Sequence, residues 1–209
     1  MAAICVLDEF EVHKNEEFLK NARGLAPTLE RKEVMPVSLL ALEKGQEMEP
    51  VVRSEETPEQ LRKHALKRDD EVILDFGTHN VGYVTLHLSS VGSHQDAPAY
   101  IYLKFVERLD ELMVNIAEYD GWISKGWIQE EYVHVDVLPA TLKLPRRYAF
   151  RYMEIKVIDV SLKYFLVVER VSMEAVSSVA MQEGVPAEMA AATARGDMSK
   201  GEISAEARE

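Results

Sequence analysis

Cysteine is nearly absent from this sequence, which holds only Cys5 among 209 residues. A single thiol excludes an internal disulfide and any metal site built from several cysteines. The six histidines, at positions 13, 64, 79, 87, 94 and 134, also lack the spacing of metal ligands. We therefore expect no cofactor, and a reducing, cytoplasmic compartment suits the chain.

Long apolar runs and a surplus of basic residues are missing as well. No stretch approaches the ~20 apolar residues that a membrane helix requires, and the first ten residues lack the basic segment that opens a secretory signal. The formal net charge is −12, from 24 basic and 36 acidic residues. Because a phosphate-binding surface needs clustered Lys and Arg, neither nucleic acid nor an anionic membrane is expected as a partner.

Alternation of apolar and polar residues is what the sequence has in abundance. The clearest case is residues 71–88, EVILDFGTHNVGYVTLHL. Apolar side chains recur at every second position of both halves, and a polar segment at residues 77–80 separates the halves. A period of two is typical of half-buried strands. We therefore predict two strands joined by a polar hinge at residues 77–80.

The same period predicts the rest of the fold. Short helices are expected at residues 15–24, capped by Asn15, and at residues 57–67, capped by Thr57. Residues 45–56 are polar and acidic and are expected to be exposed. Because helices do not alternate with strands, the fold class is all-β: a β-sandwich or jelly-roll of about eight antiparallel strands with one or two short helices. Further strands are predicted at residues 8–13, 34–43, 100–106, 131–138 (with Val133, Val135 and Val137 facing the core), 148–158 and 164–179.

One domain and a tail are expected. Residues 1–179 are predicted to form the β-sandwich domain, in which residues 8–70 carry the short helices and residues 71–179 supply the main strands. Residues 180–209 contain no aromatic residue and are rich in Ala, Glu, Met and Gly. Such a segment buries too little apolar surface to order itself, so a flexible or partly helical tail is predicted.

Two motifs carry a family resemblance. The first is LDFG at residues 74–77 followed by NVGYV at residues 80–84, and the second is YAFRYMEI at residues 148–155. In this order they resemble motifs of the β-sandwich domain in α-L-rhamnosidase-like glycoside hydrolases (family 78-like). The resemblance covers roughly residues 8–179. It implies the non-catalytic N-terminal β-sandwich region of such an enzyme, and it is compatible with export as well as with the cytoplasm.

The resemblance does not extend to catalysis. In that family the catalytic acids lie on a large α-helical barrel after the sandwich, whose motifs this sequence does not match, and residues 180–209 are too few to build it. Glycoside hydrolysis needs two carboxylates across the scissile bond, and spacing in irregular segments does not show that any two converge. We assign no catalytic residue and expect no hydrolysis by this chain alone. The available acids are Glu107, Asp110, Glu111, Glu118, Asp120, Glu130 and Glu131.

Polar residues around the predicted hinge form one candidate site. Asp75, Asn80 and Tyr83 could bind a sugar at a strand end, or calcium through carboxylate and amide oxygens. Alternatively, Asp75 and Asn80 bond the backbone of their own turn while Tyr83 fills a gap. Arg151 could clamp a sugar hydroxyl or a uronate, or it pairs with a carboxylate on a neighbouring strand.

Trp122 and Trp127 form the other candidate site. They are the only tryptophans, they lie five residues apart, and Gly121 and Gly126 precede them. Aromatic faces suit the apolar surface of a pyranose ring, and the glycines would let a loop present them. Alternatively, one or both rings plug the end of the sandwich, since large aromatics are usually well buried.

Three functions follow from these residues and from the resemblance. The first is a carbohydrate-binding or barrel-supporting module, with a rhamnose-containing glycan or a glycosidase catalytic domain as its partner. The second is a stand-alone interaction or oligomerisation domain with no sugar binding, which an exposed apolar patch would favour. The third is a compact enzyme, which would require convergent carboxylates.

Overall fold

Ten strands form one antiparallel, sandwich-like sheet in the computed structural model, which describes residues 13–44 and 50–178. The all-β prediction is confirmed, with ten strands in place of about eight. The main path runs β1-β10-β5-β9-β6-β7, and β2, β3, β4 and β8 attach beside it. The strands are β1 (Glu30–Val34), β2 (Ser38–Lys44), β3 (Pro50–Glu56), β4 (Ala65–Leu66), β5 (Glu71–Gly92), β6 (Ala99–Val106), β7 (Gln129–Val135), β8 (Ala140–Lys143), β9 (Tyr148–Asp159) and β10 (Tyr164–Ser177).

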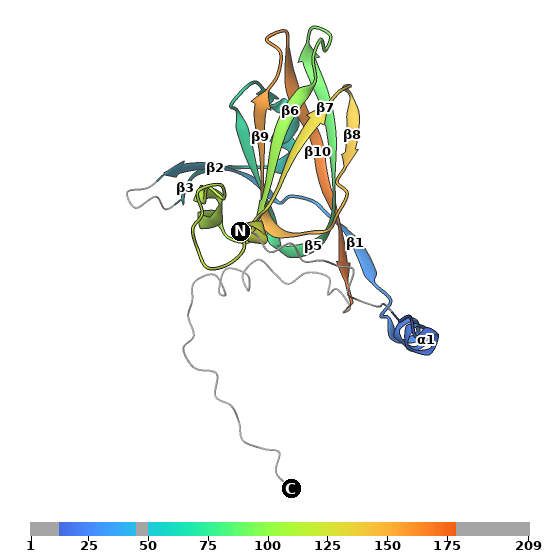
Figure 1. The fold of residues 1–209 in the computed structure, drawn as a ribbon. Coiled ribbons are helices and arrows are strands. Elements are labelled where there is room, and N and C mark those ends of the chain that lie inside the picture. The colour runs from blue at the N-terminus through green and yellow to red at the C-terminus, as the bar shows by residue number, and fades with distance from the viewer. Residues whose placement is uncertain (1–12, 45–49, 179–209) are drawn as a thin grey trace, which may run out of the picture.

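The long strands stand side by side in Figure 1, while the β2–β3 hairpin and the helix α1 (Glu16–Leu25) project away from them. Three short 3-10 helices, η2 (Pro58–Lys63), η3 (Leu109–Met113) and η4 (Lys125–Trp127), lie in the connections. As predicted, Asn15 caps α1: its Oδ1 accepts from the amide of Phe18 at 3.0 Å.

β5 is one strand of 22 residues, so the prediction of two strands joined by a hinge is wrong. Its first part pairs with β2 and β9, and its later part with β10 and β8. Between the β5–β9 pairs Asp75–Tyr152 and Asn80–Phe150, residues 76–79 lie opposite Arg151 alone. We call this irregularity the β5 bulge (residues 76–79). It absorbs extra residues without ending the strand, because partners on both sides keep the chain extended.

The core lies on the inner side of the sandwich-like sheet. It consists mainly of the apolar side chains that alternate with polar ones along the strands. The inward residues of β5 leave at most 8% of their surface exposed, and those of β6, Ile101 and Leu103, leave none. Aromatic rings fill the end near the bulge: Phe105 stacks on Tyr148 at 4.2 Å between ring centroids. Burying each such apolar side chain contributes roughly 1.5–3 kcal/mol.

Two other predictions fail, and one strand was not predicted. Residues 51–56 are exposed as expected, but residues 50–56 form β3 along β2. Thr57 makes no side-chain cap, and the predicted helix is only the 3-10 turn η2, after which β4 joins β10. Val137 follows the end of β7 and is 71% exposed instead of facing the core. Most of the predicted strand at residues 8–13, and the tail at residues 180–209, lie outside the described residues.

Candidate functional site

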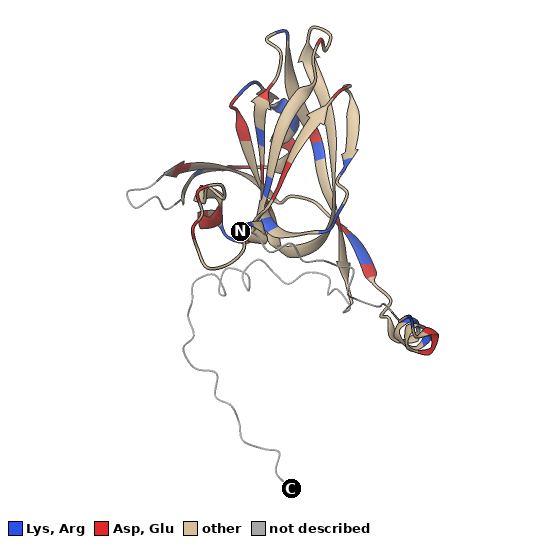
Figure 2. Ribbon diagram, in the orientation of Figure 1, with Lys and Arg blue, Asp and Glu red and all other residues tan. Residues whose placement is uncertain are grey.

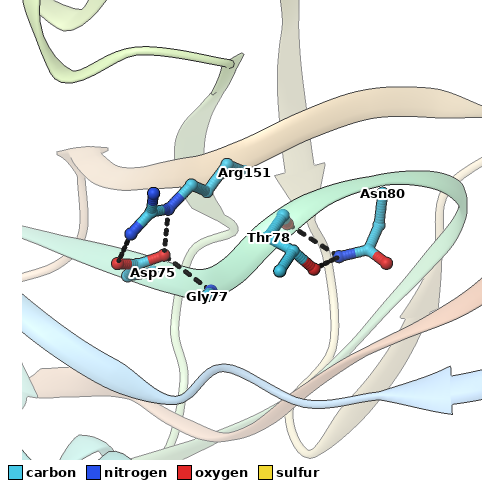
Figure 3. Close-up of polar contacts among 5 residues, drawn as sticks. All are labelled: Asp75, Gly77, Thr78, Asn80 and Arg151. Carbon is cyan, nitrogen blue, oxygen red and sulfur yellow. Dashed lines mark hydrogen bonds and ion pairs between the residues drawn. The ribbon is translucent and has the colours of Figure 1, made fainter. Parts of the chain in front are cut away.

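Asp75 and Arg151 contact each other across the β5 bulge (Figure 3). Arg151 Nε and Nη2 donate to the two carboxylate oxygens of Asp75, each at 2.9 Å. Asp75 Oδ1 also accepts from the amide of Gly77 at 2.7 Å, and Gly77 has a φ of +78°, where a residue with a Cβ is strained. The Arg151 guanidinium also lies 4.8 Å from the ring centre of Tyr152. The pair therefore stabilises the bulge, and these groups are engaged within the protein.

Asn80 and Tyr83, the other residues of this candidate site, do not join the pair. Asn80 Nδ2 donates to the backbone oxygen of Thr78 at 2.8 Å and closes the turn (Figure 3). Tyr83 lies opposite Glu174 of β10 and is 38% exposed. The contacts of Asp75 and Asn80 are those of the structural alternative. No described His, Cys, Asp and Glu residues form a group of three that could hold a metal ion.

The tryptophan loop, residues 107–128 between β6 and β7, packs on the outer side of the sheet. Its residues Leu109, Leu112, Val114 and Ile116 cover a second apolar cluster formed by Val106, Ile128 and Tyr152. Lys104 fixes the loop from below: it is 3% exposed, and its Nζ donates to the backbone oxygens of Leu112 at 3.1 Å and Val114 at 2.7 Å.

Charged groups surround the Lys104 side chain that binds the loop. Burial lowers the pKa of Lys104, opposed by Glu154, Glu130 and Glu111. Burial raises the pKa of Glu154 to about 7, and Glu71 adds to the rise while Lys104 and Lys156 oppose it. The lower side of the loop is therefore a region where proton binding and packing are coupled.

The two tryptophans differ in their surroundings. Trp122 is 95% exposed, so the alternative in which it plugs the sandwich is wrong for this residue. Trp127, in η4, is 36% exposed, and its ring centre lies 5.8 Å from that of Tyr119. A Cβ at Gly121 would lie 1.9 Å from the Tyr119 hydroxyl, so Tyr119 would have to move if this glycine were replaced. The glycine thus lets Tyr119 fold back toward Trp127 while Trp122 points into solvent.

A hollow of about 340 Å³ lies beside Trp127. Glu111 is occupied at its edge, because its Oε2 accepts from the amides of Glu107 and Arg108 at 2.8 and 3.1 Å. Glu107 faces His79 of the β5 bulge, with 3.2 Å between Oε1 and Nε2. Glu107, which lines the hollow, therefore links it to the β5 bulge. The lining of the hollow includes Phe105, Glu107, Glu111, Trp127, Gln129 and Ala149.

Sequence reasoning missed Gln129 as a residue of this hollow. Gln129 Oε1 accepts from the amide of Ala149 on β9 at 2.9 Å and so joins the start of β7 to β9. No local motif marks such a contact, since the two residues are 20 positions apart. Glu107 and Glu111 were considered only as members of a possible acidic pair, and His79 only as an isolated histidine.

The charged residues of the described strands form no large region of one sign. Acidic and basic residues are interspersed along the strands in Figure 2. Among the described residues, no helix is long and apolar enough to cross a membrane.

Comparison with known proteins identifies the family. The model of the glycosyl hydrolase family 78 α-rhamnosidase N-terminal domain matches residues 36–175. The chain belongs to this family. Its resemblance to the sandwich region of family 78 enzymes is thereby confirmed. No curated protein matches the sequence.

Two solved structures extend the comparison. A rhamnosidase from Klebsiella oxytoca with rhamnose bound is 35% identical with a TM-score of 0.74, over 79% of this chain. The alignment covers 33% of that rhamnosidase, so the family 78 domain spans about a third of its relative's length. A family 78 rhamnosidase of Bacillus sp. GL1 aligns over 55% of this chain and 10% of its own, at 14% identity and a TM-score of 0.36.

Proposed function

We propose that this family 78 N-terminal domain is a non-catalytic carbohydrate-binding module that presents the tryptophan loop to a rhamnose-containing glycan. The observation that supports it is the 95% exposure of Trp122, in the same loop as Trp127, which lines the hollow. A fully exposed indole contributes little to the core, whereas it can cover the apolar face of a sugar ring. Glu107 lines the hollow and pairs with His79 through Oε1 only, so its other carboxylate oxygen supplies an acceptor for a sugar hydroxyl.

The absence of hydrolysis is part of this proposal. A glycosidase needs a carboxyl that stays protonated and a second one across the bond. Glu154 has the raised pKa, but it lies on β9 below the tryptophan loop and is not among the residues that line the hollow. Glu111, which does line it, is bonded to backbone amides. We propose that catalysis belongs to a part of the enzyme other than this domain.

Support of a catalytic domain is a second candidate function. The observation that favours it is the alignment with only 33% of the Klebsiella oxytoca rhamnosidase, whose remaining length would lie beside this domain. In this alternative the exposed Trp122 would pack against that remainder and would not contact sugar.

A tryptophan-fluorescence titration with L-rhamnose and with a neutral oligosaccharide ending in α-L-rhamnose tests the proposal. Both tryptophans lie in the loop, so the signal reports on it alone. A saturable change is expected, and Trp122→Ala should weaken binding about tenfold by removal of one stacked ring. The matched Trp122→Phe variant keeps a ring and should bind within a few-fold of the parent. If the fluorescence shows no saturable change up to ~50 mM sugar, any binding is weaker than millimolar, and support of a catalytic domain is favoured.

A further inference from the structure

Four aromatic rings lie together on the outer face of β6 and β7, away from the tryptophan loop's hollow. Tyr100 pairs with His134 and Tyr102 with Tyr132 across the two strands. The ring centres of Tyr100 and His134 are 4.1 Å apart and nearly parallel, and Tyr132 lies 5.0 Å from Tyr102 and 6.2 Å from Tyr100. We call Tyr100, Tyr102, Tyr132 and His134 the aromatic platform.

The platform does not serve the core. Ile101 and Leu103 of β6 point to the opposite face and are fully buried. Tyr132 leaves 61% of its surface exposed. Cross-strand aromatic pairs stabilise a sheet by about 0.2–1 kcal/mol, but that gain does not need so much ring surface in water. An exposed aromatic group of this kind is typical of a recognition surface.

Polar side chains border the platform on two sides. Tyr102 Oη donates to Glu130 Oε1 at 2.6 Å. On the β9 side, Lys156 lies opposite Tyr102 and Asp159 opposite Tyr100, and Arg68 bonds Asp159 at 2.8 Å. Two acidic and two basic groups therefore balance around the rings, which suits a neutral ligand with hydroxyl groups.

One end of the platform is closed. Lys104 and Glu130 form the next cross-strand pair after Tyr102 and Tyr132. The Lys104 ammonium group binds the backbone oxygens of Leu112 and Val114, so the tryptophan loop covers this pair. The open rings therefore span about two residue pairs, or ~7 Å along the strands. Tyr100 and His134 stack on each other, and the Tyr132 ring is inclined by 42° to Tyr100 and by 50° to Tyr102. The ring face most open to a ligand is therefore that of Tyr132, which suits one sugar ring.

From this arrangement we propose that the aromatic platform is a second carbohydrate-binding surface, which stacks a neutral pyranose on Tyr132 and the neighbouring rings. The ligand class rests on the proposed function, but the site does not depend on the tryptophan loop. A sugar bound here would leave Trp122 and Trp127 unaffected.

NMR of the tyrosine rings tests the platform with the same two probes, L-rhamnose and the neutral rhamnose-terminated oligosaccharide. The tyrosines outside both the platform and the tryptophan loop, Tyr83, Tyr148, Tyr152 and Tyr164, serve as internal references. Saturable shifts of the platform rings are expected. Tyr132→Ala should weaken binding about tenfold, whereas Tyr132→Phe, which keeps the ring, should stay within about twofold.

Two further variants keep the test decisive. Phe165→Ala removes a 39% exposed ring of β10 outside the platform and should leave binding unchanged. His134→Ala replaces Tyr132→Ala if the latter does not fold, and it should also weaken binding. Platform shifts that persist in Trp122→Ala would separate this site from the loop. The proposal is overturned if the rings do not shift at ~50 mM sugar, if Tyr132→Ala or its substitute binds as the parent does, or if Trp122→Ala alone abolishes the shifts.

Discussion

The β5 bulge and the tryptophan loop are both candidate sites in the sequence, and they differ in what their side chains already contact. At the bulge, Asp75 and Arg151 use their charges on each other and on the backbone of Gly77. In the loop, Trp122 is 95% exposed. The loop itself is nevertheless fixed, because Lys104 and an apolar cluster hold it to the sheet. An exposed side chain on a supported loop, such as Trp122, is therefore suited to binding a ligand. Polar side chains whose partners lie within the protein, such as Asp75 and Arg151, have a structural role.

The largest effect on stability is expected from removing the contact between Asp75 and Arg151. Arg151→Ala leaves Asp75, whose side chain is 11% exposed, without its cationic partner. Removing one member of a partly buried ion pair should lower the free energy of unfolding by about 3 kcal/mol. Urea unfolding at neutral pH measures the loss.

Arg170→Ala is the matched control for that variant. Arg170 also bonds a carboxylate across strands, Glu33 on β1, but both side chains are about half exposed. An exposed pair contributes only about 0–1 kcal/mol. Equal losses in the two variants would contradict the structural role assigned to Asp75 and Arg151.

An effect that depends on pH, and that reaches its full size only across the whole interval, should come from Glu154 on β9. Its pKa is raised to about 7 in the folded protein, so it holds its proton more tightly when folded than when unfolded. The resulting stability is complete below pH ~4.5 and is lost as the pH rises to about 7. Relative to Glu154→Gln, the parent should lose roughly 3 kcal/mol of unfolding free energy across that interval, at about 1.36 kcal/mol for each pKa unit.

Denaturation curves of the parent and of Glu154→Gln between pH 4 and 8 check the effect. These limits lie on either side of the unfolded and folded pKa values of Glu154. The difference between parent and variant should change across the interval and then level off. A constant difference would mean that Glu154 titrates alike in both states. The charges of Glu71, Lys104 and Lys156 would then not act on it as the structure indicates.

The sequence predicts the strands better than it predicts their irregularities. β9 and β10 lie within two residues of their predicted bounds, because buried apolar residues recur along most of both strands. β3 was missed because its residues after Pro50 are all exposed, so only its pairing with β2 makes it a strand. The hinge was mistaken for a strand break because a bulge and a turn both favour Gly at positive φ.

The candidate sites show the same limit. Trp122 and Trp127 could be selected from their spacing and their glycines, since these features are local. The partnership of Asp75 with Arg151 spans 76 positions, and Tyr100 meets Tyr132 only through the register of β6 and β7. Such contacts depend on strand order, which no short motif encodes.

The smallest effect on stability is expected from the residue proposed to matter most for binding. Trp122→Ala removes a side chain that is 95% exposed, so the free energy of unfolding should change by no more than about 0.5 kcal/mol. Urea unfolding of this variant beside Trp127→Ala, whose ring is 36% exposed and lies near Tyr119, sharpens the contrast. A large loss for Trp122→Ala would place its ring in a packed environment and return it to the same class as the bulge residues. An unchanged stability together with weakened sugar binding would show that the loop is shaped for a ligand and not for the fold.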